Sequence, residues 1–527
     1  MRRGLRLLSV LLITLLGPAL LAEPSTPGDD AAPKTTERGV DNAAKAQAVL
    51  DAAKRHKAPR TWEDEALSDW ALPIAALGVR PGHFTVEEYY AAPIDNLRTY
   101  PIYHPDREPE GYWDWLHTLK PEPLVEEVGK ARTEEEWIEL GRRVFVELDV
   151  KGFRRDDPEV IAEIRSRKAL EGHEIKVTPE GWIHGLRWVP TEKGVQLGVS
   201  DCAGCHTHFM DDGTVLHGAP FDDPIDDIVA RHIGDGMDYF FPGDSLATQL
   251  HRLYAVPWVE NDPNARIADM TPEQLYQLRR SNPAGTFARA NGSPFHPNKV
   301  PDLIGIRDRH WIDATATHRH RGPGDLMRYA AMVAYEEKME FGEHQFYTDE
   351  QRFIRYRLPD DMLYALALYI YSIEPPANPN RFDARAAAGR RIFEREGCVH
   401  CHTPPLYTSN ELTPVEGFQP PKDHYDRYAI TPRSVGTDPG LGLYTRKGTG
   451  YYRIPSLRNI WYRKNLLHSG FVNSLEELFD PARLEDDFEP SGFKGLGVER
   501  RAIEGHEFGL ELDAIEREQL IAFLLTL

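Results

Sequence analysis

The sequence predicts a mainly α-helical protein that consists of two similar small domains in tandem, with long irregular loops and an extended N-terminal segment. Two observations are the basis of this prediction. A motif of the form C-x-x-C-H occurs twice, at residues 202–206 and 398–402. The pattern Gly-Arg-Arg-[Val/Ile]-Phe also occurs twice, at residues 141–145 and 389–393, each time upstream of a C-x-x-C-H motif.

Helices are predicted in the same order in both copies. Each copy begins with a helix that contains the Gly-Arg-Arg pattern and ends with an amphipathic helix rich in Leu, Ala and aromatic residues. The predicted helices are 134–148 and 361–372 in the first copy, and 384–395 and 516–527 in the second. Residues 300–307 (VPDLIGIR) also resemble residues 454–461 (IPSLRNIW), 154 positions later. Several similarities in one order indicate an internal repeat rather than coincidence.

Four segments are predicted along the chain. Residues 1–22 are a signal peptide, 23–130 an N-terminal tail and wrapping segment, 131–378 the first domain and 379–527 the second. A stretch rich in Pro and Asn marks the boundary between the domains because it cannot continue a helix. The glycine of the repeated pattern precedes the first cysteine by 61 residues in the first copy and by 9 in the second, so the first copy carries an insertion of 52 residues.

The C-x-x-C-H motif is the attachment signature of c-type haem. Two thiols three residues apart can each form a thioether bond to a vinyl group of the porphyrin, and the histidine that follows can bind the iron from the same face. A thiol redox pair, a disulfide or a zinc site would not need a histidine at the same place twice. We therefore predict two covalently bound haem c groups, each in a cytochrome c-like domain. The residues concerned are Cys202, Cys205 and His206, and Cys398, Cys401 and His402.

The first residues have the pattern of an export signal. Arg2, Arg3 and Arg6 precede an apolar run over residues 7–21, and Ala22 follows it. We predict cleavage near Ala22, no membrane span, and a periplasmic or secreted location, where thioether attachment of haem is completed. The formal net charge is −21, which argues against nucleic acid and anionic lipid as partners.

The second iron needs a ligand on the face opposite His402. No methionine follows Met362, so the second copy offers only histidines: His424, His468 and His506. We predict His506 as the distal ligand because glycines beside it in Glu-Gly-His-Glu-Phe-Gly suit a tight loop. His468 is the alternative, or else a residue that lines the pocket or binds a haem propionate.

The first iron has no histidine where the repeat would place one. The 154-residue offset puts Ala314 at the position that matches His468. Other residues near in sequence could still bind this iron: Met210, His208, His217, His232, His318 and His320. Because an unmatched ligand and longer loops are typical of a reactive haem, we expect an open or displaceable sixth position on the first haem.

Taken together, these residues resemble the bacterial di-haem cytochrome c peroxidase superfamily, which also includes the haem enzymes that mature methylamine dehydrogenase and the extracellular rubber oxygenases. The resemblance covers about residues 130–527 and includes an I-P-S-L-R-N segment followed by H-[DS]-G. The rubber oxygenase-like branch is most similar, through its wide haem spacing and a late G-H-E-[FY]-G-type histidine that matches His506. Standard peroxidases of the superfamily use a Met at the second haem, and this chain has none to offer there.

The resemblance implies that the first haem binds dioxygen opposite His206, and that Trp311, in R-x-W-[IL]-D-A-T, couples the two haems electronically. We therefore expect a redox enzyme whose first haem activates O2 or peroxide and whose second haem stores or relays electrons. An apolar organic substrate or a small redox protein is the expected further partner. The alternatives are an electron-transfer protein with two six-coordinate haems, and a haem-based sensor or partner subunit of a dehydrogenase.

Overall fold

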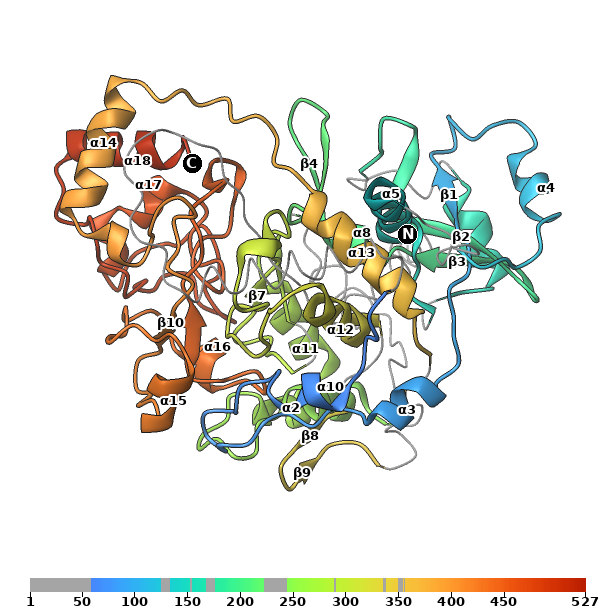
Figure 1. The fold of residues 1–527 in the computed structure, drawn as a ribbon, viewed down its shortest axis with the longest axis horizontal. Helices are drawn as coiled ribbons and strands as arrows, with labels where there is room; N and C mark the ends of the chain where they lie inside the picture. The colour runs from blue at the N-terminus through green and yellow to red at the C-terminus, as the bar shows by residue number, and fades with distance from the viewer. Residues whose placement is uncertain are drawn as a thin grey trace.

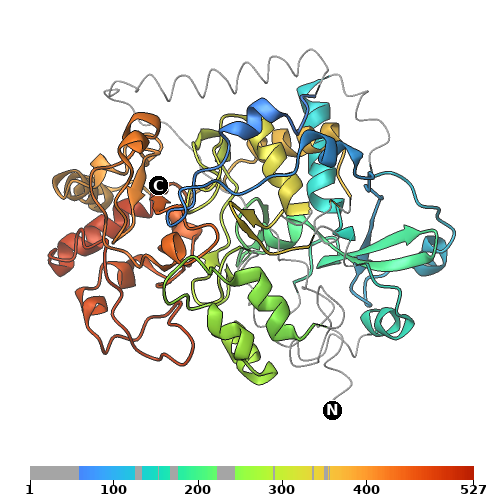
Figure 2. The same ribbon diagram turned by 90° about the horizontal axis from the view of Figure 1, so that it is seen from below.

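The computed structural model describes residues 58–124, 133–151, 154–166, 176–221, 244–288, 291–334, 338–348, 354 and 356–527. The predicted signal peptide lies outside these residues. The second copy forms one end of the molecule and a small sheet forms the other, with the helices of the first copy between them (Figures 1 and 2). None of the helices in the described part of the chain combines the length and apolar character that a membrane crossing requires.

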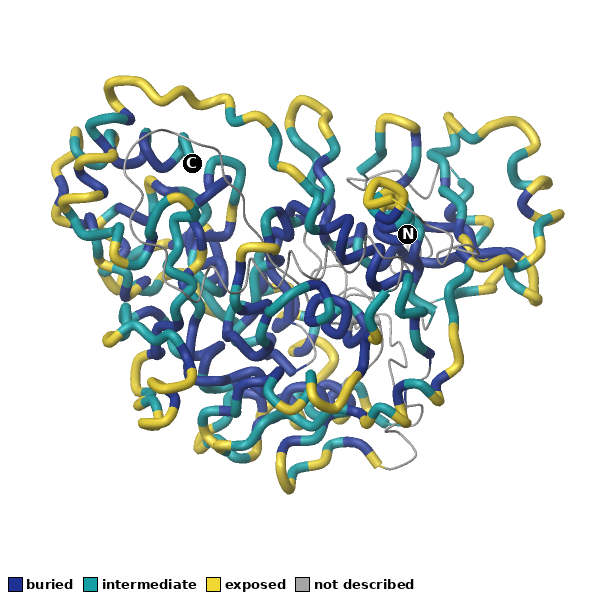
Figure 3. The backbone as a smooth tube through the Cα atoms, viewed as in Figure 1, coloured by how far each residue is buried: buried dark blue, intermediate teal, exposed yellow. Residues whose placement is uncertain are grey.

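Each copy contains the two helices that the sequence predicts, and in the structure they pack against each other. The pairs are α5 (Glu134–Glu147) with α13 (Asp360–Ser372), and α14 (Ala384–Arg395) with α18 (Ala514–Leu524). α5 begins at a capping box in which the Thr133 and Glu136 side chains bond each other's backbone N–H groups. α13 is buried along nearly its whole length, whereas α18 buries one face (Figure 3). An exposed stretch without regular secondary structure, residues 373–383, joins the two pairs.

The repeated glycines lie where the paired helices cross. A Cβ atom on Gly141 would be 1.9 Å from the carbonyl oxygen of Ala365 in α13. A Cβ atom on Gly389 would be 1.9 Å from the carbonyl oxygen of Gln519 in α18. Ala365 and Gln519 are again 154 positions apart, so the helix crossings of the two copies are built in the same way. The Gly-Arg-Arg pattern therefore marks a close contact between helix backbones.

The expectation of a mainly α-helical protein is only partly right, because the structure also contains small antiparallel sheets. The largest has three strands in the order β1 (Tyr100–Tyr103), β2 (Trp182–Thr191) and β3 (Gly194–Val199). β2 and β3 form a hairpin within the insertion of the first copy, and β1 comes from the N-terminal segment. Trp188 and Leu197 are fully buried in this sheet and pair across it, which explains why the insertion folds as strands.

Four two-stranded sheets complete the strands of the described residues. They are β4 (Thr207–Phe209) with β5 (Val215–His217), β6 (Thr286–Phe287) with β7 (Asn298–Lys299), β8 (Glu340–Phe341) with β9 (His344–Gln345), and β10 (Leu412–Pro414) with β11 (Tyr451–Arg453).

The further α-helices of the described residues are α2 (Asp64–Ser68), α3 (Val86–Ala91), α4 (Tyr112–Leu116), α6 (Pro158–Ile164), α8 (Cys202–Cys205), α10 (Leu246–Tyr254), α11 (Pro272–Arg280), α12 (Pro323–Ala334), α15 (Lys422–Arg427), α16 (Gly440–Leu443) and α17 (Leu475–Leu478).

The described part of the N-terminal segment packs on the first copy. Its Trp62, Trp70, Phe84 and Tyr89 belong to the same buried cluster as α5, α12 and α13. The backbone N–H of Leu72 donates to the carbonyl of Thr317 at 2.7 Å, which holds the segment against the loop before α12. The segment therefore contributes core to the first copy rather than forming a separate domain.

Candidate functional site

The first C-x-x-C-H motif follows β3, and its cysteines are the first and last residues of α8. His206 comes next and is buried. Its Nδ1 lies 3.1 Å from the carbonyl oxygen of Pro301. Because a carbonyl can only accept a hydrogen bond, Nδ1 carries the proton and Nε2 has the lone pair that could bind a metal.

The second motif is organised in the same way. Cys398 begins a short 3-10 turn over Cys398–His400, and His402 is buried just beyond it. Its Nδ1 lies 3.1 Å from the carbonyl oxygen of Tyr407, and the backbone of Pro455 is a further partner of the ring. Burial lowers the pKa of His402 to about 4, so the ring is neutral at neutral pH and its Nε2 can act as a ligand.

Prolines of the repeated VPDL and IPSL segments thus have a shared role. Pro301 and Pro455 are 154 positions apart, and each presents its backbone to the motif histidine of its own copy. The sequence showed the similarity of the two segments, but it did not show that their backbones orient His206 and His402. Partners of this kind fix the orientation of a metal-binding imidazole.

None of the four cysteines, all of which lie in the described part of the chain, forms a disulfide. Burial raises the pKa of Cys398 to about 11, and burial also raises the pKa of Cys202 and Cys401. These three thiols are therefore protonated at neutral pH, which does not suit a thiolate nucleophile. Protected thiols at both ends of one turn, next to an oriented histidine, are compatible with thioether attachment of haem.

His506 lies opposite His402. The centres of the two imidazole rings are 6.3 Å apart, and the ring planes are inclined by 62°. Two metal–nitrogen bonds of about 2 Å, plus about 1 Å from each bonded nitrogen to its ring centre, would separate the rings by about 6 Å. The pair thus has the spacing that an iron ligated from both sides requires. Burial lowers the pKa of His506 to about 4, so this ring is also neutral.

The loop that carries His506 is fixed by its backbone. The N–H of His506 donates to the carbonyl of Val435 at 2.7 Å, and the Arg483 guanidinium donates to the His506 carbonyl at 3.0 Å. A Cβ atom on Gly505 would lie 2.2 Å from the carbonyl carbon of Gly436, so only glycine permits this approach. The Nδ1 of His506 is buried and has no hydrogen-bond partner among the described residues.

The other histidines of the second copy lie in different surroundings. His468 stacks on Tyr452, with ring centres 4.0 Å apart and an inclination of 18°. Burial lowers its pKa to about 4, and the backbone of Asp438 is a further partner. His424 bonds the Tyr451 hydroxyl through Nδ1 at 2.8 Å. Of the three histidines considered, His506 is thus the one whose ring lies next to that of His402, in an edge arrangement.

The candidates for the first iron are spread over several environments. His320 bonds the Arg309 carbonyl through Nδ1 at 2.9 Å and the Tyr371 hydroxyl through Nε2 at 2.6 Å, so both ring nitrogens are engaged. His217 bonds the Tyr369 hydroxyl through Nδ1. The remaining candidates are Met210, which packs beside Leu216 and Ile304, His208 in β4, His318 beside Trp70, and His232, which lies outside the described residues.

Trp311 lies where the two copies meet. It is buried in a cluster with Leu412 and Tyr451 of the second copy, and its ring is 5.8 Å from that of Tyr428. The Arg319 guanidinium lies over the indole at 5.7 Å. Trp311 therefore contributes to the contact between the two copies. Its role in electronic coupling of the haems stays a prediction.

No family model matches the chain, and no curated protein matches it. Among solved structures, the chain is similar to hydrazine synthase of Kuenenia stuttgartiensis, with 14% identity and a TM-score of 0.27 over 55% of this chain and 89% of that one. It is also similar to a MauG-like protein associated with microbial copper homeostasis, with 18% identity and a TM-score of 0.20 over 32% of this chain and 56% of that one. These TM-scores are too low for a shared fold to be concluded, so the functional argument depends on this chain's own residues.

Proposed function

We propose that the protein is an exported di-haem redox enzyme. One haem c is attached at Cys202 and Cys205 and meets O2 or peroxide, and the other is attached at Cys398 and Cys401 and stores or relays electrons. The observation that carries this proposal is the pair His402 and His506, whose ring centres lie 6.3 Å apart, about the separation expected for two histidines that bind one iron.

In the second site, His402 and His506 would hold the haem iron. The Tyr407 carbonyl and the Pro455 backbone orient His402, while the Val435 carbonyl and Arg483 fix the loop of His506. A metal ligated by two histidines has no vacant position for a substrate, and a rigid ligand set keeps its geometry when the oxidation state changes. This site therefore suits electron storage or relay.

In the first site, His206 would hold the haem iron, and the proposal includes no second protein ligand for it. When bound, a haem iron with an open coordination position can bind and reduce O2 or peroxide. Pro301 orients His206 on one side. Among the candidate ligands, His320 already bonds the Arg309 carbonyl and the Tyr371 hydroxyl through its two ring nitrogens, so neither nitrogen is left for an iron.

An optical and electron paramagnetic resonance spectrum of the purified mature protein tests the proposal. Mass spectrometry should first show two haem groups bound covalently. One haem should be low-spin and indifferent to cyanide, whereas the other should be high-spin or oxygen-bound and should change on addition of cyanide, azide or peroxide. Two low-spin haems that ignore all three ligands would instead establish the alternative, an electron carrier without a substrate.

His506→Ala tests the ligand assignment. It should convert the second haem to a high-spin form and leave the first unchanged, because only one ligand of one iron is lost. His468→Ala is the matched control, since it also removes a buried histidine from the second copy but not one that faces His402. A second haem that stays low-spin in His506→Ala and becomes high-spin in His468→Ala would reverse the assignment.

A further inference from the structure

Several histidines of this chain bond the hydroxyl group of a tyrosine. Such a pair matters in a redox protein, because a phenol loses an electron far more easily when its proton can move to a nearby base at the same time. The pairs are His217 with Tyr369 at 2.8 Å, His424 with Tyr451 at 2.8 Å, and His320 with Tyr371 at 2.6 Å. The last pair is the shortest of these, and its geometry assigns every proton.

The backbone fixes the direction of the hydrogen bond between Tyr371 and His320. The Nδ1 atom of His320 lies 2.9 Å from the carbonyl oxygen of Arg309. Because a carbonyl oxygen can only accept, Nδ1 carries a proton, and the lone pair of the neutral ring is on Nε2. The hydroxyl of Tyr371 therefore donates to Nε2, and its proton can pass to His320 with little movement of the heavy atoms.

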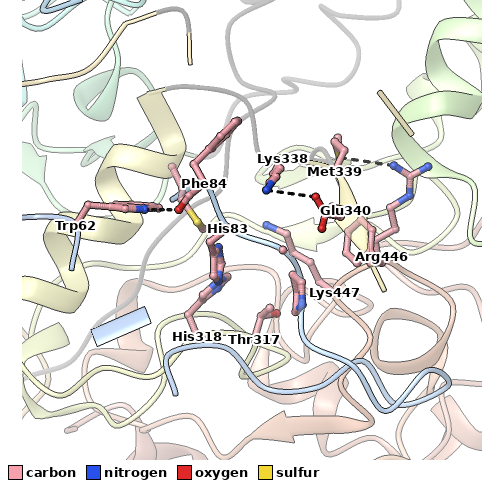
Figure 4. Close-up of a pocket in the computed structure, with 14 residues that line it drawn as sticks. Trp62, His83, Phe84, Thr317, His318, Lys338, Met339, Glu340, Arg446 and Lys447 are labelled. Atoms are coloured by element: carbon pink, nitrogen blue, oxygen red, sulfur yellow. Dashed lines mark hydrogen bonds and ion pairs between the residues drawn. The ribbon is translucent and has the colours of Figure 1, made fainter. Parts of the chain in front are cut away.

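Other histidines of the molecule lack this arrangement. His318, two residues before His320, lines a small pocket beside His83 (Figure 4), and neither of its ring nitrogens has a hydrogen-bond partner among the described residues. His217 and His424 each bond a tyrosine through Nδ1, but no backbone carbonyl of the described chain bonds their rings and fixes which atom donates. His320 is thus the histidine that is oriented to accept a proton from a tyrosine.

The surroundings of the pair keep the phenol protonated and favour a proton on His320. Burial raises the pKa of Tyr371 well above its ordinary value, and the carboxylate of Asp325 raises it further, so the phenol does not ionise by itself at neutral pH. Burial lowers the pKa of His320, whereas Asp325 raises it. The guanidinium groups of Arg309 and Arg321 lower it as well, each by less than Asp325 raises it. The charge of Asp325 therefore stabilises an imidazolium at this place.

The last turn of α13, which contains Tyr371, packs on the hairpin that follows the first C-x-x-C-H motif. Two positions after Tyr371, the Cδ1 atom of Ile373 would be 3.0 Å from a Cβ atom on Gly218. The N–H of Gly218 in turn donates to the carbonyl of His206 at 2.8 Å. Only a few packed residues therefore separate Tyr371 from the histidine of the first motif.

His320 connects the same pair to Trp311. The backbone N–H of His320 donates at 2.8 Å to the carbonyl of His310, the residue before Trp311. Arg319, the residue before His320, places its guanidinium over the Trp311 indole at 5.7 Å. Because Trp311 lies where the two copies meet, the pair of Tyr371 and His320 lies between the first motif and the interface of the copies.

We propose that Tyr371 is a redox-active tyrosine that supplies an electron to the first haem site, with His320 as its proton acceptor. In this step Tyr371 loses one electron and its O–H bond breaks, while an N–H bond forms at Nε2 of His320. The products are a neutral tyrosyl radical and an imidazolium. The oxidant is peroxide, whose reduction to two molecules of water takes two protons from solvent and two electrons, one from Tyr371 and one from the second haem. The proposal rests on the proposed function for this oxidant, whereas the pair itself needs only a one-electron oxidant.

Electron paramagnetic resonance of the mature di-haem protein, frozen rapidly after addition of hydrogen peroxide, tests the proposal. The wild type should show a tyrosyl radical, which is identified because its signal narrows when the tyrosines carry ring deuterium. Tyr371→Phe should lose this signal. Tyr364→Phe is the matched control and should retain it, since it removes a buried tyrosine of the same helix that packs on Trp137.

His320→Gln separates proton transfer from packing. The amide oxygen of glutamine can still accept the hydrogen bond of Tyr371, but it cannot take up the proton. Formation of the radical should therefore slow about 100-fold, the lower end of what a positioned proton acceptor contributes. Far-UV circular dichroism and the haem content should stay as in the wild type, which guards against a misfolded variant. An unchanged rate would overturn the role of His320.

Flash oxidation with a photo-excited ruthenium complex and a sacrificial electron acceptor needs no peroxide. It should leave the same long-lived radical in the wild type and not in Tyr371→Phe. A protein that forms the radical with light but not with peroxide would retain the redox-active pair and lose only the peroxide chemistry of the proposed function. The proposal is overturned if the signal persists in Tyr371→Phe, if it is lost instead in Tyr369→Phe or Tyr451→Phe, or if neither oxidant produces a tyrosyl radical.

Discussion

The two copies share a frame and differ in what surrounds it. Both cross two helices at a glycine, and both present a proline backbone to the histidine of the C-x-x-C-H motif. Among the described residues, the first copy is extended by a three-stranded sheet and by core residues of the N-terminal segment. In the second copy, a loop instead places the ring of His506 6.3 Å from that of His402.

This difference teaches how one repeated unit can serve two purposes. In each copy, the backbone of a proline orients the motif histidine. In the proposed function, the second copy adds His506 as a second ligand, which suits electron relay. The first copy instead adds segments to the same frame, and it is the copy that we propose to react with a small oxidant. Four substitutions can break or sharpen this comparison.

Asp302→Ala should have the largest effect, because it breaks the connection between the copies. Asp302, in the first copy, accepts hydrogen bonds from the Tyr462 hydroxyl at 2.8 Å and from Arg463 Nε at 3.1 Å, both in the second copy. The ion pair is largely buried, with side-chain exposures of 5% and 12%. Loss of one partner of a buried pair leaves the other charge uncompensated, so we expect a loss of about 3–5 kcal/mol in the free energy of unfolding.

Urea-induced unfolding, followed by far-UV circular dichroism, measures this loss. Asp423→Ala is the control, because its ion pair with Arg427 is exposed and should contribute less than about 1 kcal/mol. If the copies are coupled through Asp302, the variant should also unfold in two separate transitions. A single transition with unchanged midpoint would show that the ion pair does not hold the copies together.

Alanine at the two helix-crossing glycines should have the next largest effect. Either Cβ atom would overlap a backbone carbonyl of the partner helix, and overpacking of this kind costs about 1–3 kcal/mol or more. Gly141→Ala should cost more than Gly389→Ala, since α13 is buried on all sides and cannot move away, whereas α18 can shift toward solvent. Thermal unfolding of both variants checks the order. Equal losses would mean that the two crossings are equally confined.

The shared frame could be predicted from the sequence because it is encoded locally. The Gly-Arg-Arg pattern lies inside strong helical periodicity, and the predicted helices agree with α5, α13, α14 and α18 to within a few residues at their ends. His506 could be proposed because the second copy has no methionine and the histidine lies in a glycine-rich loop. Each of these signals lies within a short stretch of chain.

The features that distinguish the first copy could not be predicted in this way. β1 pairs with β2 about 80 positions later, and β2 has no counterpart in the second copy. His83, His318 and Lys447 line one small pocket of the structure. They lie far apart in the sequence, so no short sequence pattern predicts that they come together. The backbone partners of His206 and His402 could not be predicted from side-chain patterns either, because every residue has a carbonyl group.

Trp311→Phe should have the smallest effect on stability and a selective effect on electron exchange. Phenylalanine keeps an aromatic ring against Tyr428 and Leu412, but it removes the indole, which is easier to oxidise and reaches further across the interface. If Trp311 couples the haems, electron exchange after flash reduction of one haem should slow about tenfold, equivalent to about 1.4 kcal/mol in the barrier. Trp188→Phe, in the buried sheet of the first copy, should not alter the rate. Equal rates in both variants would make Trp311 a packing residue of the interface, and the two copies would then be joined mainly by Asp302 and its partners.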